Sequence, residues 1–328
     1  KLPYYTEKDF IPIINMASNM GLMLIVHPSH PAKNLGEFIA MGLSGEIKVT
    51  NMPTGDIKTF SIPGGRPGGN FAPVAVSDSG EDVFFVTWND LKPTSQGYGG
   101  VYKFHMDFDG SGEPSSLTRV DTNSSGSTFT NQGWSTDGDD VDISADGRFV
   151  AFAARDYITP NVWDSGQKIN IYVKDTLTNS LTHVDLGNNN KFSSNPKISD
   201  DGRYVLFESS AELTADDRSE SSSVDSYYWE TDLFLADLNS QSTIRINIDD
   251  DGNRFNTGGY GWSADMSADA NVIAFTAGGS QKIGSPDGLY DPNGGTADVF
   301  VKHLDSGDIE RISGNQNGGI YPRISPDG

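Results

Sequence analysis

The sequence predicts an all-β fold, a β-propeller built from four-stranded antiparallel blades. A short turn motif recurs along the chain at intervals of about 60 residues, and segments of strand length follow each copy. No segment has the apolar periodicity of a helix over three turns. The 37 glycines and 16 prolines suit many short strands joined by turns.

The repeated motif is a hydrophobic residue and a serine, followed by a turn rich in Asp and Gly. Its copies begin at Val76, Ile143, Ile198, Met266 and Ile324, and a degenerate copy spans 17–21. Asp accepts backbone hydrogen bonds in such a turn, and Gly adopts a positive φ at low cost. Each copy therefore predicts a tight turn between a first and a second strand.

Three further strands are expected after each motif. Apolar runs at 149–152, 204–207 and 272–275 have the continuous hydrophobicity of strands that are covered on both faces. Third strands are expected at 232–235 and 298–301, and the turn at 305–308 leads into a fourth strand at 309–312. Four strands per repeat, arranged radially, make a propeller blade.

The copies of the motif favour a ring of six blades, with five to seven blades as the range considered. We expect residues 1–328 to form a single propeller domain, in which residues 1–9 are a non-repeat extension. The copy at Ile324 stops after its first strand, so either this strand completes the first blade or the chain is a fragment of a longer protein. A strand expected at 10–15 argues against simple closure on five blades.

The motif and the strand after it resemble a known propeller repeat. Segments 198–207 and 324–328 resemble the PD40, or TolB-like, repeat of the WD40-like propellers, and 298–302 resembles its third strand. The resemblance covers residues 60–328 well and 10–60 weakly. It implies the fold but little about function, since such propellers serve as peptidase lids, envelope proteins, lyases and binding modules.

Charge and composition exclude several classes of protein. The net charge of -22 repels phosphate backbones and anionic membranes, so we expect no nucleic-acid partner. The longest apolar stretch, 20–26, is too short to insert across a bilayer. The chain has no cysteine, which excludes disulfides and thiolate sites. We expect an extracellular or periplasmic protein, with the cell surface included.

Acidic loops predict Ca²⁺ as a cofactor. Asp291, Asn293 and Asp298 place carboxylate and amide oxygens on a Gly-rich loop before a third strand, and such oxygens can wrap a hard cation. Asp107 and Asp109 begin a second segment with the spacing of a calcium loop, although its twelfth position is not Glu. The alternative is that both segments are solvated turns.

Aromatic residues that occur in only some of the repeats are the candidate ligand-binding residues. Flat rings beside Asn, Gln and Asp suit sugar faces and their hydroxyls. A Phe that recurs once per repeat, such as Phe192, is better explained by packing between blades. The candidates are Trp134, Trp163, Tyr228, Trp229, Tyr260, Trp262 and Tyr321.

No catalytic set is recognisable in the sequence. It contains no Gly-x-Ser-x-Gly, His-Glu-x-x-His or phosphate-loop motif. His27 and His30 share one loop without an identifiable third partner, and His105, His183 and His303 fall near outer strands.

The leading hypothesis is therefore a non-catalytic binding or scaffold propeller whose partner is a glycan or a cell-surface protein. One alternative is a polysaccharide lyase or hydrolase, in which Arg254, Arg323, Tyr260 and Tyr321 meet in a central pocket. Another is a structural module of a larger adhesin or surface assembly.

Overall fold

The computed structural model describes a set of segments that includes most of the predicted strands. The described residues are 37–42, 46–51, 57–61, 71–78, 82–87, 100–105, 116–126, 141–155, 169–186, 192–215, 231–248, 264–277, 297–313, 319 and 321–328. Their contacts divide the chain into two compact units, Lys1–Arg119 and Val120–Gly328. The expectation of a single propeller domain stays a prediction.

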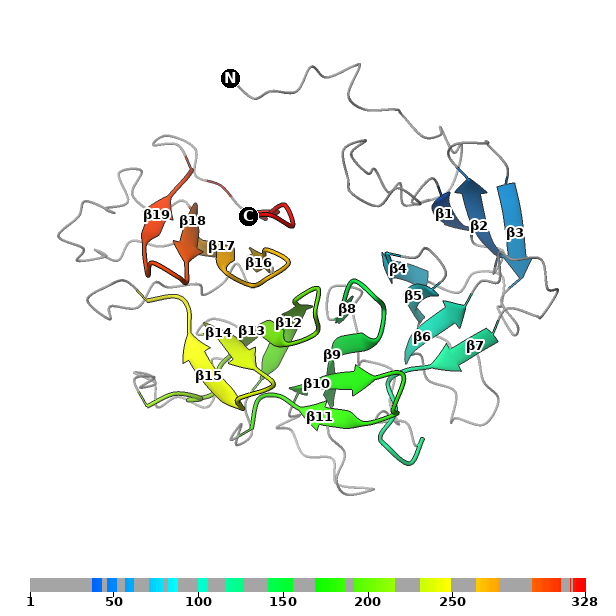
Figure 1. Cartoon of the computed structure of the whole chain (residues 1–328), viewed down its shortest axis with the longest axis horizontal. Helices are drawn as coiled ribbons and strands as arrows, with labels where there is room; N and C mark the ends of the chain where they lie inside the picture. The colour runs from blue at the N-terminus through cyan, green and yellow to red at the C-terminus, as the bar shows by residue number, and fades with distance from the viewer. Residues whose placement is uncertain are drawn as a thin grey trace, which may run out of the picture. The chain divides into compact units, whose positions relative to one another are not determined.

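The first unit contains two antiparallel sheets (Figure 1). One is three-stranded, in the order β1–β2–β3, and the other is four-stranded, in the order β4–β5–β6–β7. The strands are β1 (Glu37–Gly42), β2 (Glu46–Asn51), β3 (Ile57–Ser61), β4 (Phe71–Val76), β5 (Asp82–Thr87), β6 (Gly100–His105) and β7 (Ser116–Arg119).

The second unit contains three four-stranded antiparallel sheets, each formed by consecutive strands. The first consists of β8 (Val141–Ile143), β9 (Phe149–Arg155), β10 (Ile169–Asp175) and β11 (Leu181–His183). The second consists of β12 (Ser193–Ile198), β13 (Tyr204–Ser209), β14 (Asp232–Asp237) and β15 (Ser242–Arg245). The third consists of β16 (Ala264–Met266), β17 (Val272–Ala277), β18 (Asp298–His303) and β19 (Ile309–Arg311). The predicted four-stranded antiparallel sheets are thus confirmed.

The serine of each motif closes the hairpin between the first and second strands. In the first sheet of the second unit, the Phe149 N–H donates to Ser144 Oγ at 2.9 Å, and Ser144 Oγ donates to Asp146 Oδ1 at 2.7 Å. The same serine-to-aspartate bond joins Ser199 to Asp201 at 2.6 Å and Ser267 to Asp269 at 2.7 Å. The side chains therefore satisfy turn groups that the ladder leaves unpaired.

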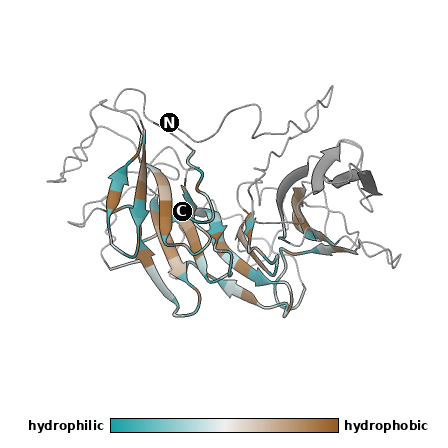
Figure 2. Ribbon diagram, turned by 45° about the horizontal axis from the view of Figure 1, so that its top comes forward, coloured by the Kyte–Doolittle hydropathy of each residue, from teal (hydrophilic) through white to brown (hydrophobic). Residues whose placement is uncertain are grey.

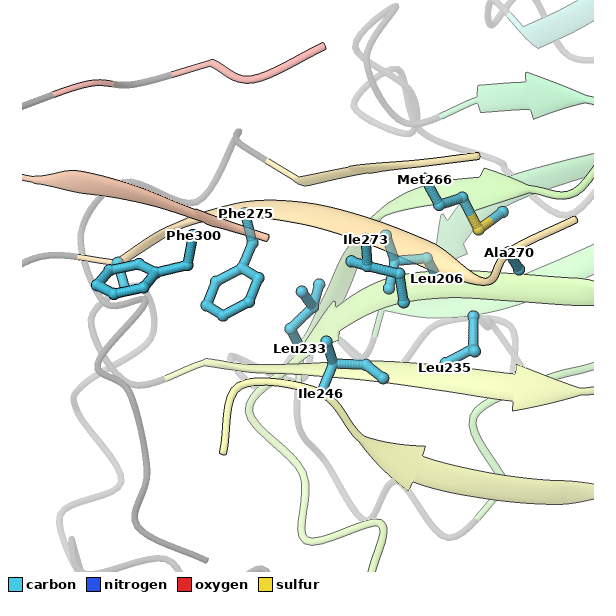
Figure 3. Packing of buried hydrophobic residues seen from close by; sticks show 10 residues of the cluster. Leu206, Leu233, Leu235, Ile246, Met266, Ala270, Ile273, Phe275 and Phe300 are labelled. Atoms are coloured by element: carbon cyan, nitrogen blue, oxygen red, sulfur yellow. The ribbon is translucent and has the colours of Figure 1, made fainter. Parts of the chain in front are cut away.

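Alternate residues of the central strands face opposite sides of each sheet and form two hydrophobic clusters in the second unit. One cluster joins β9 and β10 to β12, β13 and β14, and the other joins β13 and β14 to β16, β17 and β18 (Figure 3). Figure 2 shows the hydrophobic residues concentrated along the strands, with hydrophilic residues at the turns. Burial between sheets is the main stabilising contribution in this unit.

Each sheet of the second unit also has a contact that fastens its fourth strand to its third. The Ile171 N–H donates to Asp185 Oδ1 at 2.9 Å, and the Leu233 N–H donates to Asn247 Oδ1 at 3.0 Å. In the last sheet the Val299 N–H donates to Ser313 Oγ at 3.1 Å. We call this contact the outer clasp.

In the described part of the chain, no helix is long and apolar enough to cross a membrane.

Candidate functional site

The first strand of each sheet in the second unit forms one edge of that sheet, and these edges lie on the same side of the unit (Figure 1). Consecutive edges are joined through the motif turns. The Ala145 N–H donates to Asp200 O at 3.1 Å, the Asp200 N–H to Ala268 O at 2.9 Å, and the Ala268 N–H to Pro326 O at 3.0 Å. This ladder holds equivalent residues of successive sheets in register.

One position on these edges is charged in every copy of the second unit. It directly precedes the hydrophobic residue and serine of the motif, and acidic and basic residues alternate along the ladder. We call this set the charged row: Asp142, Lys197, Asp265 and Arg323. Asp142, Lys197 and Asp265 are half-buried, and Arg323 is exposed.

The two aspartates of the charged row also connect neighbouring edges. The Ile198 N–H donates to Asp142 Oδ2 at 2.9 Å, and the Ile324 N–H donates to Asp265 Oδ2 at 3.1 Å. A backbone N–H on the edge of a sheet needs such an acceptor where water is excluded. Each aspartate thus uses one oxygen to hold the next strand, which leaves its other oxygen without a bond to that strand.

Neighbouring residues of the charged row affect the pKa of Asp142. Burial raises the pKa of Asp142 above its ordinary value, and the negative charge of Asp265 raises it further. The positive charge of Lys197 and the hydrogen bond from the Ile198 N–H lower this pKa. A carboxylate in this setting gains from a further cationic or hydrogen-bond-donating group. The charged row can therefore bind a ligand that carries polar groups of both kinds.

Most of the ligand-binding residues predicted from the sequence lie outside the described residues. These are Trp134, Trp163, Tyr228, Trp229, Tyr260 and Trp262. Tyr321 is described; it is 59% exposed and has a φ of 58°. It stands two residues before Arg323, so it lies beside the end of the charged row. Its role as a ligand-binding residue stays a prediction.

Asp298 is the one predicted calcium ligand within the described part of the chain, since Asp107, Asp109, Asp291 and Asn293 lie outside it. Asp298 is buried at 2% exposure and directly precedes Val299, the donor residue of the outer clasp. Ser313 Oγ donates to its Oδ1 at 2.6 Å, and Arg311 Nη1 donates to its Oδ2 at 3.3 Å. Among the described residues, no group of three His, Asp or Glu side chains could hold a metal ion.

Most of the charged row lies on strand edges and not in the loops where the sequence predicts function. Arg323 is a predicted pocket residue, and Asp142, Lys197 and Asp265 are not predicted site residues. A signal was present: aligning the copies on their serine places these residues in one column.

Comparison with known proteins supports the fold. No protein-family model and no curated protein matches the chain. Among solved structures, tricorn protease aligns with 92% of this chain at 14% identity and a TM-score of 0.53. The chain spans 28% of that protease, so the similarity is one of fold.

Two further structures align at lower scores. A structure described as TolB from Agrobacterium tumefaciens aligns with 84% of this chain and 76% of its own, at 14% identity and a TM-score of 0.40. The β-propeller domain of the Trilobed protease from Pyrococcus furiosus aligns with 78% of this chain and 60% of its own, at 13% identity and 0.42. The β-propeller fold, which the sequence predicts through its resemblance to TolB-like, PD40-type repeats, is confirmed, while the number of blades stays a prediction.

Proposed function

Because the chain has the fold of a TolB-like β-propeller, we propose that it is a non-catalytic recognition module that works outside the cytoplasm, in the periplasm or at the cell surface. The observation that carries the proposal is the charged row, in which acidic and basic side chains alternate on successive strand edges held in register by backbone bonds. An array whose backbone positions are fixed suits binding, because the strands that carry the charged groups need not rearrange when a ligand arrives.

The charged row favours an exposed segment of a surface protein as the ligand. A polypeptide offers both ammonium or guanidinium groups for Asp142 and Asp265 and carboxylates for Lys197 and Arg323. A neutral glycan would use the same side chains only as hydrogen-bonding groups, with Tyr321 as a stacking surface. The glycan is therefore the second ligand class to test.

Calcium belongs to the proposal as a stabilising ion of the acidic loops. The candidate ligands Asp291 and Asn293 precede Asp298 on a Gly-rich segment, and Asp107 and Asp109 form the second candidate segment. Carboxylate and amide oxygens are the ligands that Ca²⁺ prefers. Such an ion would stabilise the folded chain without taking part in a reaction.

The test is binding by the full chain to a peptide array with varied charge patterns and to a glycan array. We expect retention of peptides of mixed charge, and a loss of affinity of at least ~10-fold in Lys197→Glu and Arg323→Glu, because each reversal removes one charge and adds its opposite. Asp305→Lys is the control, since Asp305 is an exposed residue of the outer turn between β18 and β19.

Equal binding by the parent chain and the two row variants would contradict the charged row as the binding surface. A polysaccharide substrate that the chain cleaves would instead support the lyase or hydrolase alternative. Activity on such a substrate would then be expected to depend on Tyr321 and Arg323.

A further inference from the structure

The sequence contains one Asn-x-Ser/Thr segment, the acceptor pattern for N-linked glycans, and it spans 123–125. It lies between β7 and β8, within the second unit. Ser124, Ser125 and Gly126 are exposed and Asn123 is half-buried. A pattern of this kind becomes a candidate modification site only where the fold presents it on a surface turn, and these exposures meet that condition.

Residues 123–126 form a tight turn that brings the amide and the hydroxyl of the pattern together. The Gly126 N–H donates to Asn123 O at 2.9 Å, and Gly126 has a φ of 82°. The Ser125 N–H and Oγ both donate to Asn123 Oδ1, at 3.0 and 2.7 Å. Asn is favoured at the first position of such a turn and Gly at the last. Because both bonds end on Oδ1, the Nδ2 group on the other branch of the planar amide lies away from Ser125.

The β8–β11 sheet holds this turn by its backbone. Lys174 Nζ donates to Thr122 O at 3.1 Å and to Asn123 O at 3.3 Å. Asn179 Nδ2 donates to Ser124 O at 3.1 Å. Lys174 is buried at 3% exposure, so this anchor lies inside the unit. Three successive carbonyls are thus bound by one sheet, which fixes the backbone of the turn while its side chains stay at the surface.

The neighbouring Asn179 shows what the acceptor pattern adds. Asn179 is exposed on the turn between β10 and β11, but residue 181, two positions later, is Leu and carries no hydroxyl. In Asn123 the corresponding hydroxyl, that of Ser125, donates to the amide oxygen. A donor at this oxygen stabilises negative charge on it, and therefore favours loss of a proton from Nδ2.

We propose that Asn123 is the acceptor for an N-linked glycan, an inference that rests on the proposed location outside the cytoplasm. The donor is an oligosaccharide linked to a lipid pyrophosphate, and the catalyst is an N-oligosaccharyltransferase. A bond forms between Asn123 Nδ2 and C1 of the first sugar, and the bond between C1 and the pyrophosphate oxygen breaks. The lipid pyrophosphate leaves with the electron pair of that bond, and a carboxylate of the transferase takes one Nδ2 proton.

The test uses the folded full chain, the lipid-linked oligosaccharide and a purified transferase that requires only Asn-x-Ser/Thr. We expect the intact mass to rise by one glycan, and peptide mass spectrometry to place the glycan at Asn123. Ser125→Thr keeps the hydroxyl, and Ser124→Ala changes only the variable position, so both variants should be modified. Asn123→Gln and Ser125→Ala should lose the gain in mass.

A synthetic peptide of residues 119–126, assayed in parallel, separates a poor acceptor sequence from an acceptor that the fold hides. A folded chain that gains no glycan overturns the proposal, by the second cause if the peptide is modified and by the first if it is not. Modification of Ser125→Ala to the same extent as the parent would also overturn it. Because the components are purified, the result is independent of the peptide and glycan arrays and of where the chain resides. A glycan gained in this assay but missing from the chain in cells that export it to such a transferase would support the acceptor and count against the proposed location.

Discussion

The last position of each motif turn shows how one Cβ changes the stability of a turn. Gly202 has a φ of 73° and its missing Cβ makes room for the Phe149 ring. Ala270 occupies the same position with a φ of 59°, and it is buried at 2% exposure. A residue with a side chain pays about 1–2 kcal/mol for the left-handed conformation, so Ala270 carries a strain that its buried methyl group offsets.

These two positions should therefore respond differently to exchange. We expect Gly202→Ala to lower the free energy of unfolding by about 2–4 kcal/mol, because left-handed strain adds to overpacking against Phe149. Ala270→Gly should change it by less than about 1 kcal/mol, since relief of strain is offset by the loss of a buried methyl and by the flexibility of Gly. Urea unfolding measures both, and a large gain in Ala270→Gly would contradict the proposed offset.

At the scale of the element, a bidentate ion pair fastens the start of the second strand to the end of the third. Arg148 Nε donates to Asp175 Oδ1 at 3.1 Å and its Nη2 donates to Oδ2 at 2.8 Å, and Arg203 binds Asp237 in the same way at 3.0 and 2.7 Å. The pair holds the pKa of Asp175 well below its usual range, with bonds from the Thr178 side chain and the Leu177 and Thr178 N–H groups adding to the effect.

This pair predicts a defined pH dependence. A carboxylate whose pKa is lower in the folded state stabilises the fold at pH values above its unfolded pKa of about 3.9, and this contribution is lost as the pH falls below that value. We expect Asp175→Asn to lower the free energy of unfolding at pH 7 by about 1 kcal/mol, a modest figure because the Arg148 side chain is 40% exposed. The difference from the parent should shrink between pH 4 and pH 2, in urea unfolding at each pH. A difference independent of pH would contradict the ion pair as its cause.

The last residue of the fourth strand, two residues before the acceptor of the outer clasp, is a histidine in one sheet and an arginine in the other two. Arg245 and Arg311 stand at the end of β15 and β19, and His183 holds this position in β11. His183 stacks on Tyr172 with ring centroids 4.9 Å apart, and its Nε2 lies 3.0 Å from Asp185 Oδ1 without the geometry of a hydrogen bond. In the first unit, Arg119 lies 5.8 Å over Tyr102, so an Arg can stack in the same way.

We therefore expect His183→Arg to be tolerated and to stabilise the sheet. A guanidinium donates to a carboxylate in a fork and also stacks on an aromatic face. The gain in free energy of unfolding should be about 0.5–1 kcal/mol in urea unfolding at pH 7. His183→Gln is the matched control without a charge. An equal gain in His183→Gln would show that packing, not charge, sets the effect.

For the whole molecule, the sequence predicts well those strands whose structure is determined by residues close to them in the chain. Runs such as 149–152 and 272–275 lie within β9 and β17, because a motif turn and a continuous apolar run determine a strand without reference to distant residues. The charged row and the outer clasp depend on neighbours far along the chain. Asp142 meets Ile198, and Asp298 meets Ser313, only once the sheets have formed, so composition and spacing could not assign their roles.

The net charge of -22 gives a further expectation at this scale, because repulsion among acidic groups destabilises the folded chain and cations relieve it. Screening by Na⁺ or Mg²⁺ would act through ionic strength alone, whereas a site built from Asp291 and Asn293 would select Ca²⁺. At fixed ionic strength, we expect Ca²⁺ to raise the thermal midpoint by several degrees (~2–5 °C), an effect that Mg²⁺ does not reproduce and excess chelator removes. Asp291→Asn should abolish this rise, and Asp305→Asn, on an outer turn, should keep it. Equal midpoints in Ca²⁺ and Mg²⁺ would mean that the acidic loops act only through their charge.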